Sequence, residues 1–416
     1  MQENNISPNN FENCLKCNIC TEVCPMMAAN PHYPGPKQAG PDGERYRLKD
    51  PAFYDLTLKY CLNCKRCEVA CPSGVKVGDI IQIARLKHGR QTRPIRDTAL
   101  ASTDFVGTLA SAFAPVANPL LKSAPVKGVL DVLGVDRRRT FPAYSSQKFV
   151  DWFRNEAPSQ EGFRRYVSYF HGCYANYNYP ALGRAFVTLL NACGYGVRLL
   201  DKEKCCGVAL ISNGMGAQAT RQAKVNLASI RKALEDGSEA VLTSSSTCTF
   251  TMRDEYSHIL GLAADDVRGK LTLAVKFLFD KVETGAVRLA FKPEWHASFA
   301  YHTACHMQKL GWQLCSTGLL RKIPGLKLAV LPQECCGIAG TFGFKKENYP
   351  YSQKIGEKLF RAIRGSGASA VVTDCETCKW QIGMGTGLAV YNPIEVLVSA
   401  LDLEKTAQLN RGCGDE

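Results

Sequence analysis

Short hydrophobic runs alternate with longer amphipathic stretches through the second half of the chain. Between residues 296 and 390, three runs have the length and apolar character of buried strands, namely Ser298–Tyr301, Leu326–Leu331 and Ala368–Thr373. The stretch Tyr351–Arg364 carries its apolar residues at helical spacing instead. Residues 165–260 show the same alternation less clearly. Strands that alternate with helices predict an α/β fold with short parallel sheets.

Residues 95–145 have a different pattern and contain no cysteine. Phe105–Leu121 is a 17-residue run without a charged side chain, but prolines interrupt it and it is too short to span a bilayer. Its apolar residues fall on one side of two short helices, and Val126–Leu133 predicts a third helix. The apolar positions of the first two helices are Phe105, Leu109, Phe113, Val116, Leu120 and Leu121.

A basic cluster at Asp136–Arg139 follows these helices. Apolar helix faces that end in a basic cluster are typical of segments that lie in the interface of an anionic membrane. We therefore expect residues 95–145 to form an amphipathic linker that binds a membrane surface. Packing against the protein's own core or against a partner subunit is the alternative.

Two copies of a C-x2-C-x2-C-x3-C-P motif lie near the N-terminus, at Cys14–Pro25 and Cys61–Pro72. Three thiolates at this spacing wrap one face of a cubane, and the fourth ligates a second cluster. The predicted ligand sets therefore cross: Cys14, Cys17, Cys20 and Cys71 hold one [4Fe–4S] cluster, and Cys61, Cys64, Cys67 and Cys24 hold the other. Zinc sites or disulfides are the alternatives. The 36 residues from Pro25 to Tyr60 resemble the longer connection of helical ferredoxin domains in respiratory dehydrogenases.

A second cysteine pattern is duplicated later in the chain, with an offset of 130 to 132 residues. Cys173, Cys205, Cys206 and Cys248 correspond to Cys305, Cys335, Cys336 and Cys378. Each group follows predicted strands, and open α/β sheets bind ligands just past the carboxyl ends of their strands. We expect Gly207 and Gly337, which follow the paired cysteines, to let the backbone approach a cluster closely. The paired cysteines themselves are interpreted as bridging two irons of an unusual cluster.

The two copies differ at one position, where the second has Cys375 as a fifth cysteine and the first has Ser245. The second site is therefore the better candidate for an iron–sulfur cluster. The first site either holds a cluster with four thiolates or is retained only for its packing.

Other residues carry weaker signals. His171, His302 and His306 lie close to the cysteines and could donate protons, ligate iron or hydrogen-bond a cluster sulfide. Cys193 and Cys315 are expected to be buried apolar residues, and Cys413 to lie in a polar tail. We find no dinucleotide fingerprint after a strand, no P-loop and no Ser/His/Asp arrangement. Flavin chemistry and substrate oxidation are therefore expected to come from another chain.

The composition is that of a globular protein, with 416 residues of which 45% are hydrophobic and 21% charged. The formal net charge of +13 is a weak argument for nucleic acid, because thiolate-bound clusters would offset part of it. A basic surface that faces anionic lipid or an acidic partner fits better. The polar start of the chain, Met1–Pro8, has no signal-peptide pattern, and cysteines at metal spacings are typical of a reducing cytoplasm.

The duplicated Cys-Cys-Gly (CCG) pattern resembles the cysteine-rich domains of the heterodisulfide reductase family, which also occur in lactate-utilisation, glycolate oxidase and unusual succinate dehydrogenase subunits. A closer resemblance is to the C subunits of anaerobic glycerol-3-phosphate dehydrogenases, and it extends over essentially the whole chain. The stretches that carry it are CCGVALISNG from Cys205, TSSSTCTFTMRDEY from Thr243, CCGIAGTFGFKKENYP from Cys335 and TDCETCKWQI from Thr373.

This resemblance implies an electron-transfer and membrane-anchoring subunit without catalytic residues for dehydrogenation. Electrons would pass from the flavin of partner A and B subunits, through iron–sulfur clusters, to membrane quinone at the cytoplasmic face of the inner membrane. The CCG sites would hold one or two further clusters, of the non-cubane [4Fe–4S] type. An iron–sulfur subunit of a lactate or glycolate dehydrogenase, or a catalytic disulfide reductase, is the alternative. Disulfide cleavage would be favoured by two complete five-cysteine sites. The first site is incomplete, because it has Ser245 where the second has its fifth cysteine.

The predicted organisation is multidomain. The expected parts are a helical ferredoxin domain with two [4Fe–4S] clusters at 1–94, the linker at 95–145, CCG repeats at 165–290 and 296–403, and a tail at 404–416.

Overall fold

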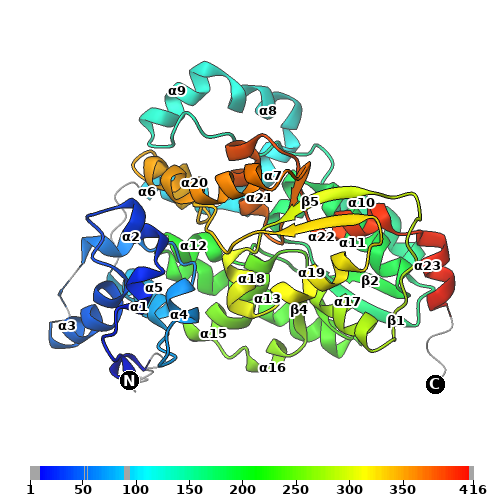
Figure 1. The fold of residues 1–416 in the computed structure, drawn as a ribbon, viewed down its shortest axis with the longest axis horizontal. Helices are drawn as coiled ribbons and strands as arrows, with labels where there is room; N and C mark the ends of the chain where they lie inside the picture. The colour runs from blue at the N-terminus through cyan, green and yellow to red at the C-terminus, as the bar shows by residue number, and fades with distance from the viewer. Residues whose placement is uncertain (1–9, 51, 54, 89–93, 412–416) are drawn as a thin grey trace.

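The computed structural model describes residues 10–50, 52, 53, 55–88 and 94–411. In Figure 1 a helical N-terminal module, drawn in blue, lies beside two α/β repeats that make up the rest of the body. A group of short helices between them in sequence protrudes from one side of the body (Figure 1). Cys413, expected to lie in a tail, is outside the described residues.

The N-terminal module consists of short helices around its cysteine loops. Its elements are η1 (Phe11–Asn13), α1 (Ile19–Glu22), α2 (Pro25–Ala29), η2 (Gln38–Asp42), α3 (Gly43–Lys49), η3 (Leu56–Tyr60), α4 (Arg66–Val69) and α5 (Val77–His88). Lys16, Asn18, Asn63 and Lys65 have φ between 56° and 64°, at equivalent positions of the two cysteine loops. This left-handed conformation costs a non-glycine residue about 1–2 kcal/mol, so the surrounding contacts must fix it. Both cysteine loops therefore follow the same backbone path.

The linker forms four helices, α6 (Pro94–Ala101), α7 (Thr103–Ala112), α8 (Ala114–Lys122) and α9 (Ala124–Val132). Proline lies in the first turn of α8 and of α9, where its missing N–H costs no helical hydrogen bond. The three helices predicted after Phe105 are present. We call α7–α9 the arm, and Figure 1 shows α8 and α9 standing clear of the body. Its exposed apolar side chains are Phe105, Leu109, Phe113, Val116, Leu120, Val129, Val132 and Leu133.

The basic cluster after the arm is divided between surface and interior. Arg138 is exposed and donates to Asp136 Oδ2 at 2.7 Å. Arg139 is buried, and its guanidinium donates to the Gly343 carbonyl and to Ser352 Oγ. The expectation of one basic cluster facing a membrane is therefore wrong for Arg139, because acceptors in the second repeat hold it inside the protein.

Each repeat contains a four-stranded parallel sheet. The first has the order β2-β1-β3-β4, with β1 (Arg165–Phe170), β2 (Tyr195–Leu199), β3 (Val241–Thr243) and β4 (Leu271–Leu273). The second has the order β6-β5-β7-β8, with β5 (Ala297–Tyr301), β6 (Leu326–Val330), β7 (Ala370–Val372) and β8 (Val390–Tyr391). The three strands predicted in the second repeat are confirmed, and the α/β repeats with short parallel sheets are as expected.

Helices cover both sheets. Those of the first repeat are α10 (Phe149–Glu156), α11 (Pro180–Ala192), α12 (Val208–Ser212), α13 (Gly216–Glu235), α14 (Ser246–Phe250), α15 (Tyr256–His258), α16 (Asp265–Arg268) and α17 (Ala274–Glu283), with turns η4 (Ala157–Gln160), η5 (Tyr174–Asn178) and η6 (Thr251–Glu255). Those of the second are α18 (Cys305–Leu310), α19 (Gln313–Arg321), α20 (Tyr349–Gly365), α21 (Glu376–Thr386), α22 (Pro393–Ala400) and α23 (Leu403–Asn410), with turn η7 (Phe342–Phe344). The helix predicted at Tyr351–Arg364 is α20.

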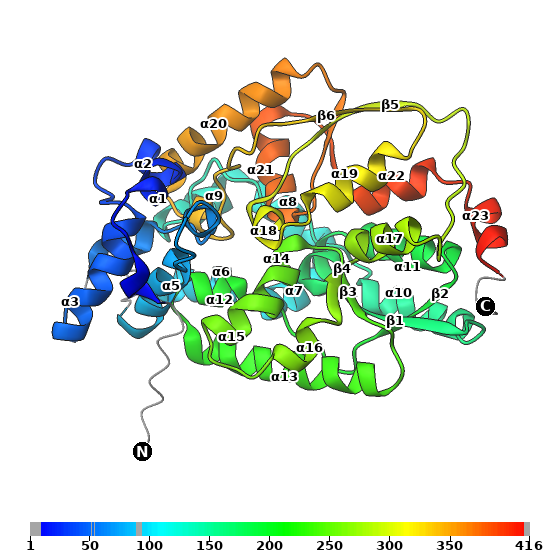
Figure 2. The same ribbon diagram turned by 60° about the horizontal axis from the view of Figure 1, so that its bottom comes forward.

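The two repeats share one hydrophobic core. Helix α11 packs against α22, and α17 packs against α19, so the repeats meet through their helices as well as through their loops (Figure 2). Ser246 donates from both its backbone N–H and its hydroxyl to the carbonyl of Asp374, which joins the loops that carry the last cysteines of each repeat. Within the described residues, no helix combines the length and the apolar character needed to cross a membrane.

Candidate metal centres

The thiols of the N-terminal module lie in two groups. Burial raises the pKa of Cys20, and the thiols of Cys14, Cys71 and Cys17 raise it further. Burial raises the pKa of Cys24 to about 12, and the nearby thiols of the second motif contribute to this rise. Each motif therefore sends its fourth cysteine to the group formed by the other motif, which is the grouping that the spacing predicts. Ligation of a [4Fe–4S] cluster by each group stays a prediction.

The two groups differ in their access to solvent. Cys17 of the first group is exposed, and the apolar side chains of Leu15 and Ile19 beside it are exposed as well. Cys67 of the second group is buried, and burial raises its pKa well above the usual range. The first group thus reaches the protein surface and the second faces the interior.

The second thiol group lies against the second repeat. Burial raises the pKa of Cys305, and the neighbouring thiol of Cys64 raises it further. His306 Nε2 donates to the Asn63 carbonyl at 3.0 Å, so the imidazole of α18 is attached to the loop between the cysteines of the second motif. The first cysteine of the second repeat is therefore a direct neighbour of the N-terminal module.

A buried ionic network holds this contact together. The ammonium group of Lys65, whose side chain is fully buried, lies 2.5 Å from Asp79 Oδ1, 3.5 Å from Glu255 Oε1 and 3.8 Å from Glu68 Oε1. Burial opposes its charge, but these carboxylates outweigh burial and raise the pKa of Lys65. Lys309 of the second repeat reaches Glu68 from the other side, at 2.8 Å. Since Glu255 belongs to the first repeat, the network joins the N-terminal module to both repeats.

The thiols of each repeat come together at the carboxyl edge of its sheet, as predicted from the strand pattern. In the first repeat, the thiols of Cys173, Cys205, Cys206 and Cys248 are successive neighbours that shift one another's pKa. In the second repeat, the thiols of Cys335, Cys336, Cys378 and Cys375 are successive neighbours, and the Cys336 thiol hydrogen-bonds Cys378 Sγ at 3.3 Å.

Ser245 takes the structural place of the missing fifth cysteine. Ser245 precedes α14 in an extended conformation, as Cys375 precedes α21, and each side chain affects the pKa of a thiol of its own site. The Ser245 side chain also lies beside the carboxyl group of Glu376 from the second repeat, whose pKa burial and the Cys375 thiol raise to about 8. The two CCG sites therefore lie next to each other across the interface between the repeats.

A second contact bridges the sites at Thr247. Its hydroxyl lies 3.4 Å from Cys375 Sγ and 3.3 Å from His306 Nδ1. Because His306 Nε2 donates to the Asn63 carbonyl, Nδ1 is the acceptor and the Thr247 hydroxyl donates to it. One chain of polar contacts thus links the second motif of the N-terminal module, the second CCG site and the first CCG site.

The surroundings of the second site fit an iron–sulfur cluster. Both ring nitrogens of the buried His302 have no hydrogen-bond partner among the described residues. Burial lowers the pKa of His302 to about 4, so the ring is neutral at pH 7 and carries one N–H donor. A buried donor left unpaired costs about 1–3 kcal/mol, and a cluster sulfide at this site would accept from it. Among the described residues, no group of three or more His, Cys, Asp or Glu side chains has an arrangement that could hold a single metal ion.

The histidine of the first repeat has a different environment. His171 lies two residues before Cys173, whereas His302 lies three residues before Cys305, so the two histidines are not at equivalent positions, and His171 Nδ1 lies 3.0 Å from Glu203 Oε1. Glu203 also accepts from the backbone N–H groups of His171 and Gly172. The second repeat has Gln333 at the position of Glu203, and its side chain pairs with Gln308 instead. The position equivalent to His302 in the first repeat is the buried Phe170, so a buried imidazole without a hydrogen-bond partner at this position is particular to the second repeat.

The CCG turns have the same backbone conformation in both repeats. Gly207 and Gly337 have φ of 89° and 86°, which favours glycine regardless of what lies nearby. A Cβ on Gly337 would overlap the carbonyl oxygen of Ser352 in α20, whereas a Cβ on Gly207 would meet nothing closer than Ala219 at 3.8 Å. Backbone conformation accounts for both glycines and helix packing adds to it at Gly337, while close approach of this backbone to a sulfide stays a prediction.

Cys193 and Cys315 are buried away from the cysteine groups, as predicted. Burial raises the pKa of Cys193 to about 12, so it stays a neutral thiol.

Sequence reasoning missed Asp104 of α7, which accepts a hydrogen bond from the Cys205 backbone N–H at 2.8 Å. Burial raises the pKa of Asp104 to about 6. No motif marks this residue, because only the tertiary structure brings the arm onto the first CCG site.

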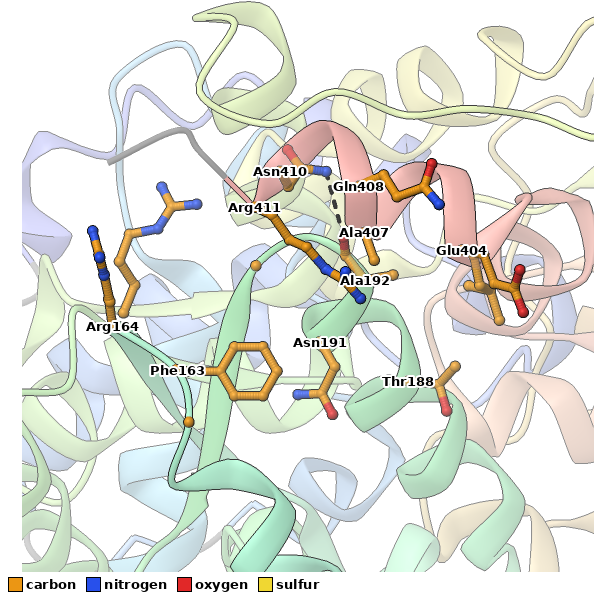
Figure 3. Close-up of a pocket in the computed structure, with 14 residues that line it drawn as sticks. Phe163, Arg164, Thr188, Asn191, Ala192, Glu404, Ala407, Gln408, Asn410 and Arg411 are labelled. Atoms are coloured by element: carbon orange, nitrogen blue, oxygen red, sulfur yellow. Dashed lines mark hydrogen bonds between the residues drawn. The ribbon is translucent and has the colours of Figure 1, made fainter. Parts of the chain in front are cut away.

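A hollow of about 1130 Å³ lies at the opposite edge of the first sheet, where β1 begins (Figure 3). Figure 3 shows Phe163 and Asn191 on one side and Glu404 and Arg411, from α23 and its end, on the other. It therefore lies apart from the candidate centres, which occupy the carboxyl edge.

Comparison with known proteins agrees with this division of the chain. Residues 10–75 match the 4Fe-4S dicluster domain family, and residues 167–253 and 299–383 match the cysteine-rich domain family. The C subunit of the anaerobic glycerol-3-phosphate dehydrogenase of Escherichia coli (strain K12) is 52% identical over 392 residues, which cover 94% of this chain and 98% of that protein. The glycolate oxidase iron–sulfur subunit of the same strain is 24% identical, with 94% of each chain covered. Among solved structures, a glutamate racemase isoform from Bacillus anthracis matches 61% of this chain and 85% of its own at 9% identity, with a TM-score of 0.29 that is too low to carry an argument.

Proposed function

The chain belongs to the family of anaerobic glycerol-3-phosphate dehydrogenase C subunits, and on that premise we propose that it carries electrons from a flavin-containing dehydrogenase to a membrane quinone. The two thiol groups of the N-terminal module would hold [4Fe–4S] cubanes, and the CCG sites would hold one or two further clusters. The glycerol-3-phosphate-oxidising A and B subunits are the proposed partners.

The observation that carries this proposal is the unbroken succession of thiol groups. It begins at the exposed Cys17, continues through the buried second group to its neighbour Cys305, and ends where Thr247 meets Cys375. Bound iron–sulfur clusters take up and release single electrons. Clusters bound to thiol groups that follow one another in this way would suit stepwise electron transfer from the protein surface to the interface between the repeats.

The protein's own residues support such a path. The left-handed loops and the Lys65 network fix the second thiol group against α18. Arg139 stays charged at neutral pH, since burial lowers its pKa only to about 10, and its charge acts on the nearby Cys336 thiol. A buried cation beside thiolates stabilises additional negative charge, which favours the reduced state of a cluster.

Iron analysis of anaerobically purified protein tests the cluster assignment. Three clusters require about twelve irons per chain, and four require about sixteen. A content near eight irons would leave only the N-terminal module loaded and would remove the CCG sites from the path.

Membrane association is proposed to involve the arm. Phe105, Leu109 and Phe113 lie on α7 and at its end, and Val116 and Val132 extend the apolar face to α8 and α9. Apolar side chains on short helices that stand clear of the body suit insertion into the interfacial region of a bilayer. We propose a peripheral position at the cytoplasmic face of the inner membrane. Cover by a partner subunit is the competing explanation, and vesicle binding by the isolated chain distinguishes the two.

The partner's substrate follows from the family and not from any residue of this chain. A pull-down from native anaerobic membranes would identify it. Recovery of glycerol-3-phosphate-oxidising A and B subunits is expected, whereas recovery of a glycolate or lactate dehydrogenase would replace the proposed partner and leave the electron-transfer role in place.

A further inference from the structure

A cavity of about 210 Å³ lies between the arm, the first CCG site and the second repeat. Most of its wall is apolar or aromatic, and Val106, Phe141, Tyr144, Tyr174, Phe344 and Trp380 contribute to it. The rings support one another: the centroids of Tyr174 and Trp380 are 5.4 Å apart, and those of Phe141 and Phe344 are 5.2 Å apart. Flat side chains held in place in this way form a slot that suits a planar ligand.

Sulfur atoms form another part of the wall. All four thiols of the first CCG site, Cys173, Cys205, Cys206 and Cys248, line the cavity, and Cys173 and Cys248 keep some accessible surface. A cluster bound to these thiols would occupy this end of the cavity. Cys375 of the second repeat also lines it. A ligand in this cavity would therefore lie beside the thiols of both CCG sites, at the inner end of the proposed electron path.

Helix α7 covers the cavity and connects it to the exposed apolar face of the arm. Asp104 fixes the start of the helix to the Cys205 backbone, and Gly107 packs so closely on Tyr177 that a Cβ would overlap the ring. Val106 faces the cavity, while Phe105 and Leu109 of the same helix are exposed. Helix α7 thus has the cavity on one side and exposed apolar side chains of the arm on the other. A ligand in the cavity would therefore lie close to the lipid that the arm would contact.

We propose that this cavity binds the ring of a membrane benzoquinone or naphthoquinone. The inference rests on the proposed function, which requires a quinone site but does not locate it. Pockets for drug-sized ligands measure about 300–1,000 Å³, so this smaller cavity admits a ring and leaves an apolar tail outside, along the arm. Reduction of one quinone consumes two electrons and two protons and yields one quinol. The electrons come from the flavin-linked partner through the clusters, and the protons come from water.

The test measures binding of menadione, a soluble naphthoquinone, to the oxidised, iron-loaded protein by anaerobic calorimetry. Val106→Trp fills the cavity from α7, and Leu109→Trp is the matched control on the exposed side of the same helix. Val106→Trp is expected to weaken menadione binding about tenfold or more, with iron content and vesicle binding unchanged, and Leu109→Trp is expected to leave binding as in the parent protein.

A second pair of variants distinguishes obstruction of the cavity from a folding defect. Ala99→Trp narrows the rim of the cavity from α6, and Thr98→Trp places the same side chain on the exposed surface one residue earlier. Weakened binding in Ala99→Trp alone supports the proposal.

Two outcomes would overturn it. Equal menadione binding by Val106→Trp, Ala99→Trp and their controls would show that the ring binds elsewhere. Loss of iron in proportion to loss of menadione would show that the cavity only houses a cluster. Failure of the proposed function is a separate result, because it would appear as iron-free CCG sites or as clusters that a reductant cannot reduce, before any quinone is added.

Discussion

Membrane binding through the arm can be tested by replacing Phe105 and Phe113 together with serine. The two side chains are 72% and 61% exposed, so burial in lipid would remove about two thirds of each ring from water. Full burial of a phenylalanine side chain is worth about 1.5–3 kcal/mol, which gives about 1–2 kcal/mol for each ring and about 2–4 kcal/mol for both. Since about 1.4 kcal/mol corresponds to a tenfold change, the double variant should bind vesicles about 30-fold more weakly or worse.

The assay is sedimentation of the purified, iron-loaded chain with vesicles of phosphatidylethanolamine and phosphatidylglycerol. A matched control replaces Leu314 and Leu48, which are 70% and 66% exposed on other parts of the molecule, with serine. Iron content shows that both variants remain folded. Vesicle binding that is unchanged in the arm variant, or reduced equally in the control, would refute the assignment of the arm as the membrane contact.

Three further substitutions test the interior. Lys65→Met removes the cation from among three buried carboxylates, and breaking a buried ionic contact on one side costs about 3–5 kcal/mol. Hydrogen exchange of α5 should accelerate accordingly, while Lys16→Met, at an exposed lysine in the other cysteine loop, should leave it unchanged. His302→Leu should lower the reduction midpoint of one cluster by about 20–65 mV with iron content retained, because a hydrogen bond worth about 0.5–1.5 kcal/mol to the reduced cluster is lost. An unaltered midpoint, or the same shift in the exposed His296→Leu, would exclude that hydrogen bond. Cys378→Ser should reduce the iron content by about four atoms, and Cys315→Ser should not; equal iron content in both would remove Cys378 from the ligand set.

Local sequence patterns predicted the elements that depend on short-range order. The strands before Cys305, Cys335 and Cys375 were predicted because apolar runs of strand length precede these residues. The three short helices after Phe105 were predicted for the same kind of reason. Cysteine spacing also predicted which thiols of the N-terminal module lie together, since a three-residue step and a following proline restrict where the fourth side chain can point.

Features that depend on contacts between distant segments were not accessible in this way. In the sequence, Lys65 is only a basic residue between two cysteines. The structure shows that the buried carboxylates of Asp79 and Glu255 lie beside its ammonium group. Arg139 was grouped with its exposed neighbours because nothing in the sequence marks the acceptors of the second repeat that surround it. The lack of a hydrogen-bond partner for the buried His302 became visible only in the tertiary structure, because the sequence does not show which groups surround a side chain.

The first CCG site shows how a sequence difference acquires a structural meaning. The absence of a fifth cysteine at Ser245 suggested a weakened site. Ser245 nevertheless precedes α14 as Cys375 precedes α21, and its side chain lies beside Cys248 and, across the repeat interface, beside Glu376. The first site is therefore an oxygen-for-sulfur variant of the second, which supports a retained role for it.

The central claim is that electrons pass from a partner's flavin through the clusters of this chain to quinone. The most direct test mixes the complex isolated from anaerobic membranes with glycerol 3-phosphate and follows the visible absorption of its iron–sulfur clusters, before and after menadione is added. The account predicts that substrate bleaches the clusters and that menadione restores their absorption. Reduction of the flavin without bleaching of the clusters, in a complex that still reduces menadione, would contradict it.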